Sequence, residues 1–222
     1  MTRTKYVTEL EKLPAGLREM AKQVDRMLAQ AMETLAQRNS ELTEIIFRED
    51  DDVDALNVHI ESDCLTLIAL YQPVGRDLRL ISSAYNIVTD LERIGDHGVD
   101  IAKIARKLGH VSPFQAPQEL FVMSATVRSM LRTLTVAFET TDPQILAEMK
   151  RWNEDVEYGR ERFESKIYAA MESRSVDTVR ASYLLFVAHH LEEISGHMVR
   201  IAERLQYYAT GKLVHTQLSR AA

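Results

Sequence analysis

The sequence contains few of the residues that interrupt helices. Only 8 glycines and 5 prolines occur among its 222 residues, and its leucine, alanine, methionine, glutamate and arginine content favours helix over strand. We therefore predict an all-α fold. Cys64 is the single cysteine, so no disulfide can form within the chain. This scarcity of cysteine is typical of a reducing compartment and predicts a cytoplasmic protein.

The sequence also lacks an excess of basic residues and a long hydrophobic run. Its 33 acidic and 27 basic residues give a net charge of −6, which argues against a surface that neutralises nucleic-acid phosphates. The longest apolar run, Tyr183–Ala188, is far shorter than the roughly 20 residues of a membrane-spanning helix. Residues 1–17 lack the apolar core of a signal peptide. Any membrane role is therefore expected to depend on a partner.

Apolar residues recur at helical spacing in the first half of the chain and predict three antiparallel helices. The first helix begins either at a capping box formed by Thr8 and Glu11, with a kink at Pro14, or near Pro14 itself. The second is expected from an N-cap at Ser40 to just before Pro73, and the third from an N-cap at Asp77 to Gly109. The apolar stripes of these helices are, in order, Met20, Val24, Met27, Ala31 and Leu35; Leu42, Ile45, Val53, Leu56, Ile60 and Leu67; and Leu78, Ile81, Tyr85, Val88, Leu91, Ala102, Ala105 and Leu108.

The segment 110–117 contains two prolines and follows Gly109, so it is predicted to be a linker between repeats at 1–109 and 118–222. After it the helical pattern resumes. We expect helices at about 119–139, 142–171 and 175–208, with Gly211 ending the last.

The two halves are related in sequence. Residues 91–102 align without gaps with residues 191–202, and seven of the twelve positions are identical. Residues 52–54 resemble residues 155–157, at an offset of 103 instead of 100. The chain is therefore predicted to be an internal duplication, folded as two tandem three-helix bundles related by pseudo-two-fold symmetry.

Three carboxylates are spaced by four residues along the third predicted helix: Glu92, Asp96 and Asp100. Like charges at this spacing repel by a few tenths of a kcal/mol per pair, so a cation is expected nearby. The cation is either a basic side chain, Arg93 or Lys103, or a metal ion that also takes oxygen ligands from the preceding helix. Carboxylate oxygens favour a hard ion such as Mg²⁺, Ca²⁺, Mn²⁺ or ferric iron. The candidate ligands on the preceding helix are Asp51, Asp52 and Asp54.

The segment DLERIGDHGVDIAKIA, which begins at Asp90, is similar to the signature of PhoU proteins, the regulators of phosphate transport. DDDVDALNVHIE, from Asp50, resembles the middle helix of that family, and IAERLQYYATGK, from Ile201, its closing helix. The resemblance implies metal ligation by Glu92, Asp96 and Asp100, with the segment 51–54 facing them.

The same resemblance implies a function. PhoU proteins are adaptors, not enzymes, that negatively regulate phosphate uptake and phosphate-starvation signalling. They couple the phosphate ABC transporter, through its ATPase subunit, to a sensor histidine kinase. A homodimer is also expected.

The second copy departs from the metal-binding pattern. Glu192 matches Glu92, but Gly196 and Arg200 stand where the first copy has aspartates, so the equivalent site is predicted to be lost. One alternative is a substitute site for zinc or iron at His189, Glu193 and His197, again spaced by four residues. The residues do not distinguish iron, manganese, magnesium, calcium and zinc.

Two other functions compete with an adaptor. A di-iron oxidoreductase also places carboxylates on facing helices, but it requires Glu-x-x-His pairs, and the Glu193 to His197 spacing is one residue too long. A coiled-coil scaffold would need an uninterrupted heptad seam, which the proline and glycine breaks oppose.

Overall fold

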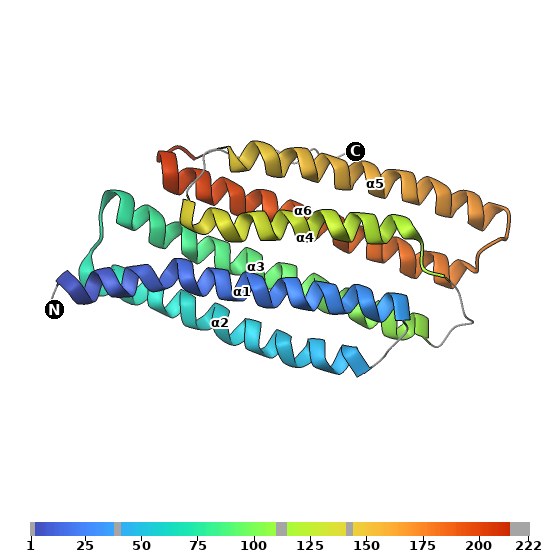
Figure 1. The fold of residues 1–222 in the computed structure, drawn as a ribbon, viewed down its shortest axis with the longest axis horizontal. Helices are drawn as coiled ribbons and strands as arrows, with labels where there is room; N and C mark the ends of the chain where they lie inside the picture. Colours follow the sequence, from blue (N-terminus) through green and yellow to red (C-terminus); the bar gives the residue numbers. More distant parts are fainter. Residues whose placement is uncertain (1–2, 38–40, 110–114, 141–143, 214–222) are drawn as a thin grey trace.

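The computed structural model describes residues 3–37, 41–109, 115–140 and 144–213. These residues form six α-helices and confirm the all-α prediction (Figure 1). The helices are α1 (Arg3–Gln37), α2 (Glu41–Tyr71), α3 (Gly75–Gly109), α4 (Gln118–Thr140), α5 (Ile145–Glu172) and α6 (Thr178–Thr210).

Several predicted helix ends need correction. Helix α1 begins at Arg3 and continues through Pro14, so it does not begin near the proline. Asp77 is not the N-cap of α3, because α3 begins at Gly75; its carboxylate instead accepts a hydrogen bond from the Tyr6 hydroxyl, at 2.9 Å. The predicted cap at Ser40, the predicted start of the fifth helix at residue 142 and linker residues 110–114 lie outside the described residues.

Helix α6 has a defined cap at each end. Its N-cap is Asp177, whose side chain accepts a hydrogen bond from the backbone N–H of Arg180 at 3.0 Å, which satisfies one of the amides left unpaired at a helix start. Gly211 ends the helix in a left-handed conformation, with φ at 75°, as a residue without Cβ readily does. The predicted stop at Gly211 is therefore confirmed.

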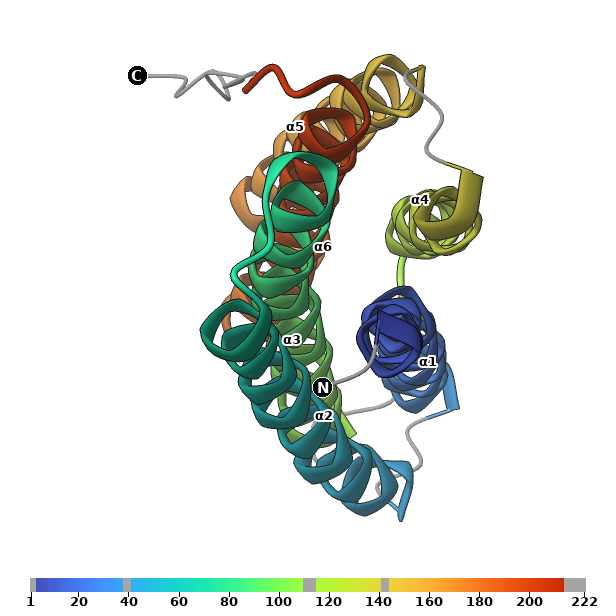
Figure 2. The same ribbon diagram turned by 90° about the vertical axis from the view of Figure 1, so that its left-hand side faces the viewer.

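Four of the six helices form a curved layer, and the other two lie on its concave side. Figure 2 shows α2, α3, α6 and α5 following one another around the curve, with α1 and α4 packed inside it. Helix α3 contacts α6, and α1 contacts α4, so the two halves meet along two pairs of helices. In both pairs the helices run antiparallel (Figure 1).

The described residues confirm two tandem three-helix bundles related by pseudo-two-fold symmetry. Leu91, Ile94 and Ile101 are buried in α3, and their counterparts Leu191, Ile194 and Ile201 are buried in α6. The two corresponding helices thus bury the same stripe of apolar residues. Helices α1 and α4 also correspond, at an offset of 103, and their matched core pairs are Met20 and Met123, Val24 and Val127, and Met27 and Met130.

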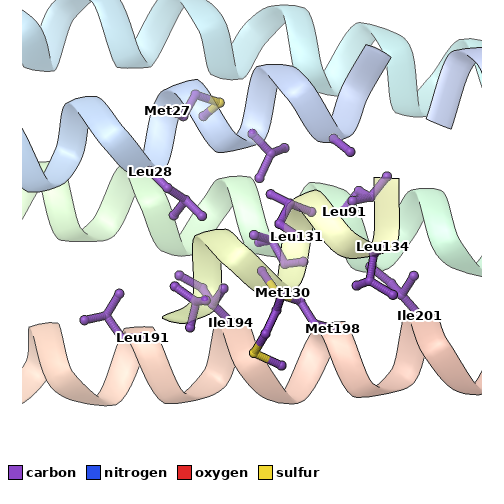
Figure 3. Packing of buried hydrophobic residues seen from close by; sticks show 14 of the residues in the cluster. Met27, Leu28, Leu91, Met130, Leu131, Leu134, Leu191, Ile194, Met198 and Ile201 are labelled. Carbon is purple, nitrogen blue, oxygen red and sulfur yellow. The ribbon is translucent and has the colours of Figure 1, made fainter. Parts of the chain in front are cut away.

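One hydrophobic core extends through both bundles. Figure 3 shows Leu28 of α1, Leu91 of α3, Leu131 of α4 and Ile194 of α6 within it. Three residues of the predicted stripes are exposed instead: Ile45, Leu78 and Tyr85. In α2 the neighbouring Ile46 is buried, because it continues the seven-residue spacing of Val53, Ile60 and Leu67. Among the described residues, no helix is long and apolar enough to span a membrane.

Candidate functional site

Acidic side chains of α2 and α3 converge on one side of the first bundle. We define the acidic face as Asp50, Asp51 and Asp54 of α2 with Glu92 and Asp96 of α3. Asp50 and Asp54 are four residues apart, as are Glu92 and Asp96, so each pair lies along one stripe of its helix. Asp50 packs close to the α3 backbone, because Gly95 has no side chain there: a Cβ on Gly95 would lie 3.7 Å from Asp50 Oδ1.

The carboxyl groups of the acidic face disfavour one another's charge. Burial, followed by the charges of Asp54, Asp96 and Asp51, raises the pKa of Asp50 to about 6. Burial and the charge of Asp96 likewise raise the pKa of Asp54 and that of Glu92. A cation bound among these groups would relieve both the repulsion and the cost of burying the carboxylates.

The structure brings four of the predicted ligands close to Asp50 or to one another. Besides burial, the charges of Asp51, Asp54 and Asp96 help to raise the pKa of Asp50, and those of Asp96 and Asp54 help to raise that of Glu92. Asp52 is exposed on α2, as Asp51 and Asp54 are. Asp100 pairs with Lys103 at 3.0 Å.

Asp50 was not among the predicted ligands. Its spacing of four residues from Asp54, the same as that of Glu92 and Asp96, was the available signal in the sequence.

The structure offers support for both cations that the sequence allows, basic side chains and a metal ion. Arg93 lies 3.2 Å from Asp96 and 3.8 Å from Glu92, and Lys103 pairs with Asp100. The side chain of Arg93 is 58% exposed, and such pairs contribute only about 0–1 kcal/mol. Asn57, one turn beyond Asp54, has a buried Oδ1 without a hydrogen-bond partner among the described residues. This oxygen is a further acceptor that a cation would satisfy.

Among the described residues, no three carboxyl groups of the acidic face have ligand atoms that all lie within 4.8 Å of one another. In the described part of the chain, the three potential ligand atoms that lie within 4.8 Å of one another belong to a different group: His97, Glu193 and His197. An ion at the acidic face would therefore have to draw its oxygen ligands closer together.

The second bundle carries its own hydrogen bonds and ion pairs at the equivalent positions. Arg160, which corresponds to Asn57, lies 2.7 Å from Glu192 and 2.6 Å from Glu164. Asn153, which replaces Asp50, donates a hydrogen bond to Glu157 at 2.6 Å and accepts one from the Ser195 hydroxyl at 2.7 Å. The second bundle thus has a neutral amide in place of Asp50 and a guanidinium that pairs with Glu192.

The substitute site considered on α6 has a different composition from the one expected. His189 is exposed, and its Nδ1 lies 3.8 Å from a carboxylate oxygen of Glu192. The ligand atoms that do approach those of Glu193 and His197 belong to His97 of α3. A spacing pattern within one helix does not reveal a neighbour that packs against it from another.

Comparisons with known proteins agree with this architecture. The family model described as PhoU domain matches twice, at residues 17–105 and 120–205. A phosphate-specific transport system accessory protein PhoU homolog from Clostridium acetobutylicum is 31% identical over 96% of this chain and 98% of its own length. The homolog of the same name from Aquifex aeolicus is 34% identical over 96% of both chains.

Solved structures give the same result. The crystal structure of the phosphate transport system regulatory protein PhoU from Streptococcus pneumoniae superposes with a TM-score of 0.88 at 28% identity, covering 95% of this chain and all of that one. PhoU from Pseudomonas aeruginosa gives 0.87 at 26% identity, covering 93% and all of the respective chains. These matches give no support to a di-iron oxidoreductase. The chain therefore belongs to the PhoU family, whose members are regulatory and accessory proteins, not enzymes.

Proposed function

We propose that this protein is an accessory regulator of phosphate transport. It couples the ATPase subunit of the phosphate ABC transporter to a sensor histidine kinase, and it reduces uptake and starvation signalling when phosphate is plentiful. The observation that carries the proposal is the match to phosphate-transport accessory proteins over nearly the full length of both chains. The similarity extends to the fold of two PhoU structures, one of them named as a regulatory protein.

The proposed setting is the cytoplasm, with the membrane reached only through the transporter. The burial of Cys64, the single cysteine, is compatible with a reducing compartment. The homodimer expected from the family resemblance stays a prediction, and sedimentation analysis of the purified chain would test it.

We further propose that the acidic face binds a hard cation and that the second bundle has no counterpart of this site. The difference between the bundles supports the idea: Arg160 neutralises Glu192 in the second, whereas Asp50, Asp54 and Glu92 of the first have raised pKa values. Oxygen ligands suit Mg²⁺, Ca²⁺, Mn²⁺ or ferric iron.

Metal analysis tests the cation proposal. The protein is stripped with a chelator and reloaded with Mn²⁺, and bound metal and thermal stability are then measured. Asp96→Asn removes a charged ligand and is expected to lower both together, because an ion that binds only the folded state stabilises it. Glu157→Gln, at the position that corresponds to Asp54, is the matched control and should change neither. Unchanged manganese content in Asp96→Asn would refute the site, and depletion by Glu157→Gln would place it in the other bundle.

A deletion strain tests the regulatory role. Without the gene, we expect phosphate-starvation genes to be expressed even in phosphate-rich medium, and the wild-type gene should restore repression. Complementation by Asp96→Asn and Glu157→Gln then asks whether the acidic face contributes to signalling. Normal repression in the deletion strain, with any second PhoU-type gene also removed, would contradict the proposal.

A further inference from the structure

The contact between α3 and α6 brings histidines of both bundles together. His97 and His197 occupy corresponding positions in the duplicated segments, and their ring centroids lie 5.6 Å apart. His190 and Asp90 are another corresponding pair, and each contacts the histidine of the opposite bundle. The cluster thus lies where the pseudo-two-fold axis passes between α3 and α6.

The geometry of this cluster is close to that of a metal site. One ligand atom each from His97, Glu193 and His197 lies within 4.8 Å of the other two. In a tetrahedral zinc site with bonds of about 2.0–2.1 Å, neighbouring ligand atoms are about 3.4 Å apart. Side-chain movements of about an ångström would therefore complete three of four positions and leave the fourth for water or another ligand.

One ring nitrogen of each histidine, Nδ1, already forms a hydrogen bond. Nδ1 of His197 lies 2.8 Å from Asp90 Oδ1, and Asp90 in turn pairs with Arg200 at 3.1 Å. Nδ1 of His97 shares a hydrogen bond with Nδ1 of His190 at 3.0 Å. In both rings Nε2 is the nitrogen left for an ion. A carboxylate bound to the other nitrogen of a ligating histidine is the outer-shell arrangement that orients metal ligands in proteins.

Burial also restricts the orientation of these side chains. The side chains of His197 and Asp90 are only 12% and 15% exposed, so their mutual orientation is set by packing between the helices. Among the described residues, the Glu193 carboxylate is not part of an ion pair, which leaves it available as the anionic ligand.

We propose that His97, Glu193 and His197 form a binding site for a zinc-class transition-metal ion that bridges the two bundles. Two imidazoles and one carboxylate suit Zn²⁺ better than the hard cations proposed for the acidic face. One ligand comes from α3 and two come from α6, so the ion stabilises the contact between the bundles. This site is separate from the acidic face and does not depend on the proposed regulatory function.

Cobalt and zinc titrations of metal-free protein test the site. Co²⁺ bound in a tetrahedral environment with nitrogen ligands is expected to produce visible d–d absorption, and Zn²⁺ should displace it and raise the melting temperature. His97→Gln and His197→Gln each remove a ligand and should weaken Zn²⁺ binding at least tenfold and abolish the cobalt spectrum. His59→Gln is the matched control, because His59 is 72% exposed on α2, and it should behave as wild type.

Glu193→Gln keeps the test decisive if a histidine variant fails to fold, since it changes one ligand while keeping its size; it too should weaken Zn²⁺ binding at least tenfold. Asp96→Asn should leave the cobalt spectrum unchanged. Wild-type affinity in folded His97→Gln or Glu193→Gln would overturn the proposal. Loss of the spectrum in Asp96→Asn alone would also overturn it, because zinc would then bind only at the acidic face.

Discussion

Asp50 shows how a single side chain in the acidic face opposes stability. Its pKa is raised to about 6, first by burial and then by the neighbouring aspartates. The folded protein therefore binds this proton more tightly than the unfolded chain, where an aspartate has a pKa near 3.9. In the absence of a bound cation, the charged carboxylate destabilises the fold above pH 6, and this cost disappears as the pH falls towards 4.

Asp50→Asn is expected to stabilise the metal-free protein at pH 8. The gain should be about 1 kcal/mol after allowance for solvent screening, and it should shrink as the pH is lowered from 7 to 4. Urea unfolding in the presence of a chelator, across this pH range, measures it. Asp52→Asn, a change of the same kind at an exposed position of α2, should have little effect. Lower stability of Asp50→Asn at every pH would show that the carboxylate is not destabilising.

At the scale of helices, the close packing of α1 against α3 depends on a glycine. A Cβ placed on Gly98 would lie 3.3 Å from Leu28 Cδ2 and 4.0 Å from the Leu28 backbone nitrogen. A larger residue here would have to displace Leu28, which is buried in the common core. Well-packed interiors absorb such displacements only at a cost in free energy.

Gly98→Val is expected to lower the free energy of unfolding by about 1–3 kcal/mol. Gly109→Val, at the end of the same helix, controls for the change in helix propensity, because a Cβ there would meet nothing within 4 Å. The difference between the two variants in denaturant unfolding isolates the packing cost. If both variants had the same stability, the approach of α1 to α3 would not be restrictive.

For the whole molecule, the two bundles are joined by more than a shared linker. The common core passes from α3 into α6 and from α1 into α4. Arg128 of α4 also reaches the Asp25 carboxylate of α1 with two nitrogens, at 2.7 and 3.0 Å. These residues occupy corresponding positions of the repeats, so this ion pair spans the pseudo-two-fold axis. We expect the bundles to unfold together.

Leu91→Ala tests this cooperativity. Leu91 is fully buried in the first bundle, and its truncation should cost about 2–5 kcal/mol. The single tryptophan, Trp152, belongs to the second bundle. Its fluorescence transition in denaturant should shift by the same amount as the circular dichroism transition. Leu65→Ala, at an exposed position of α2, is the control. A tryptophan transition that does not shift would show that the bundles unfold independently.

Several features of this protein were predictable from its sequence. The apolar stripe from Met20 to Leu35 and the match of residues 91–102 with 191–202 were sufficient to predict helices, a duplication and two bundles. They were sufficient because helical periodicity and repetition are local properties that packing preserves. The departures at Gly196 and Arg200 likewise indicated that the repeats differ in chemistry.

Other features depended on tertiary structure. The burial of Ile46 in place of Ile45, and the packing of Asp50 against Gly95, follow from how α2 is rotated against its neighbours. The approach of His97 to His197 joins residues 100 positions apart. Spacing along one helix determines which side chains share a face. The contact between two helices determines which faces meet and which charged groups are buried away from water.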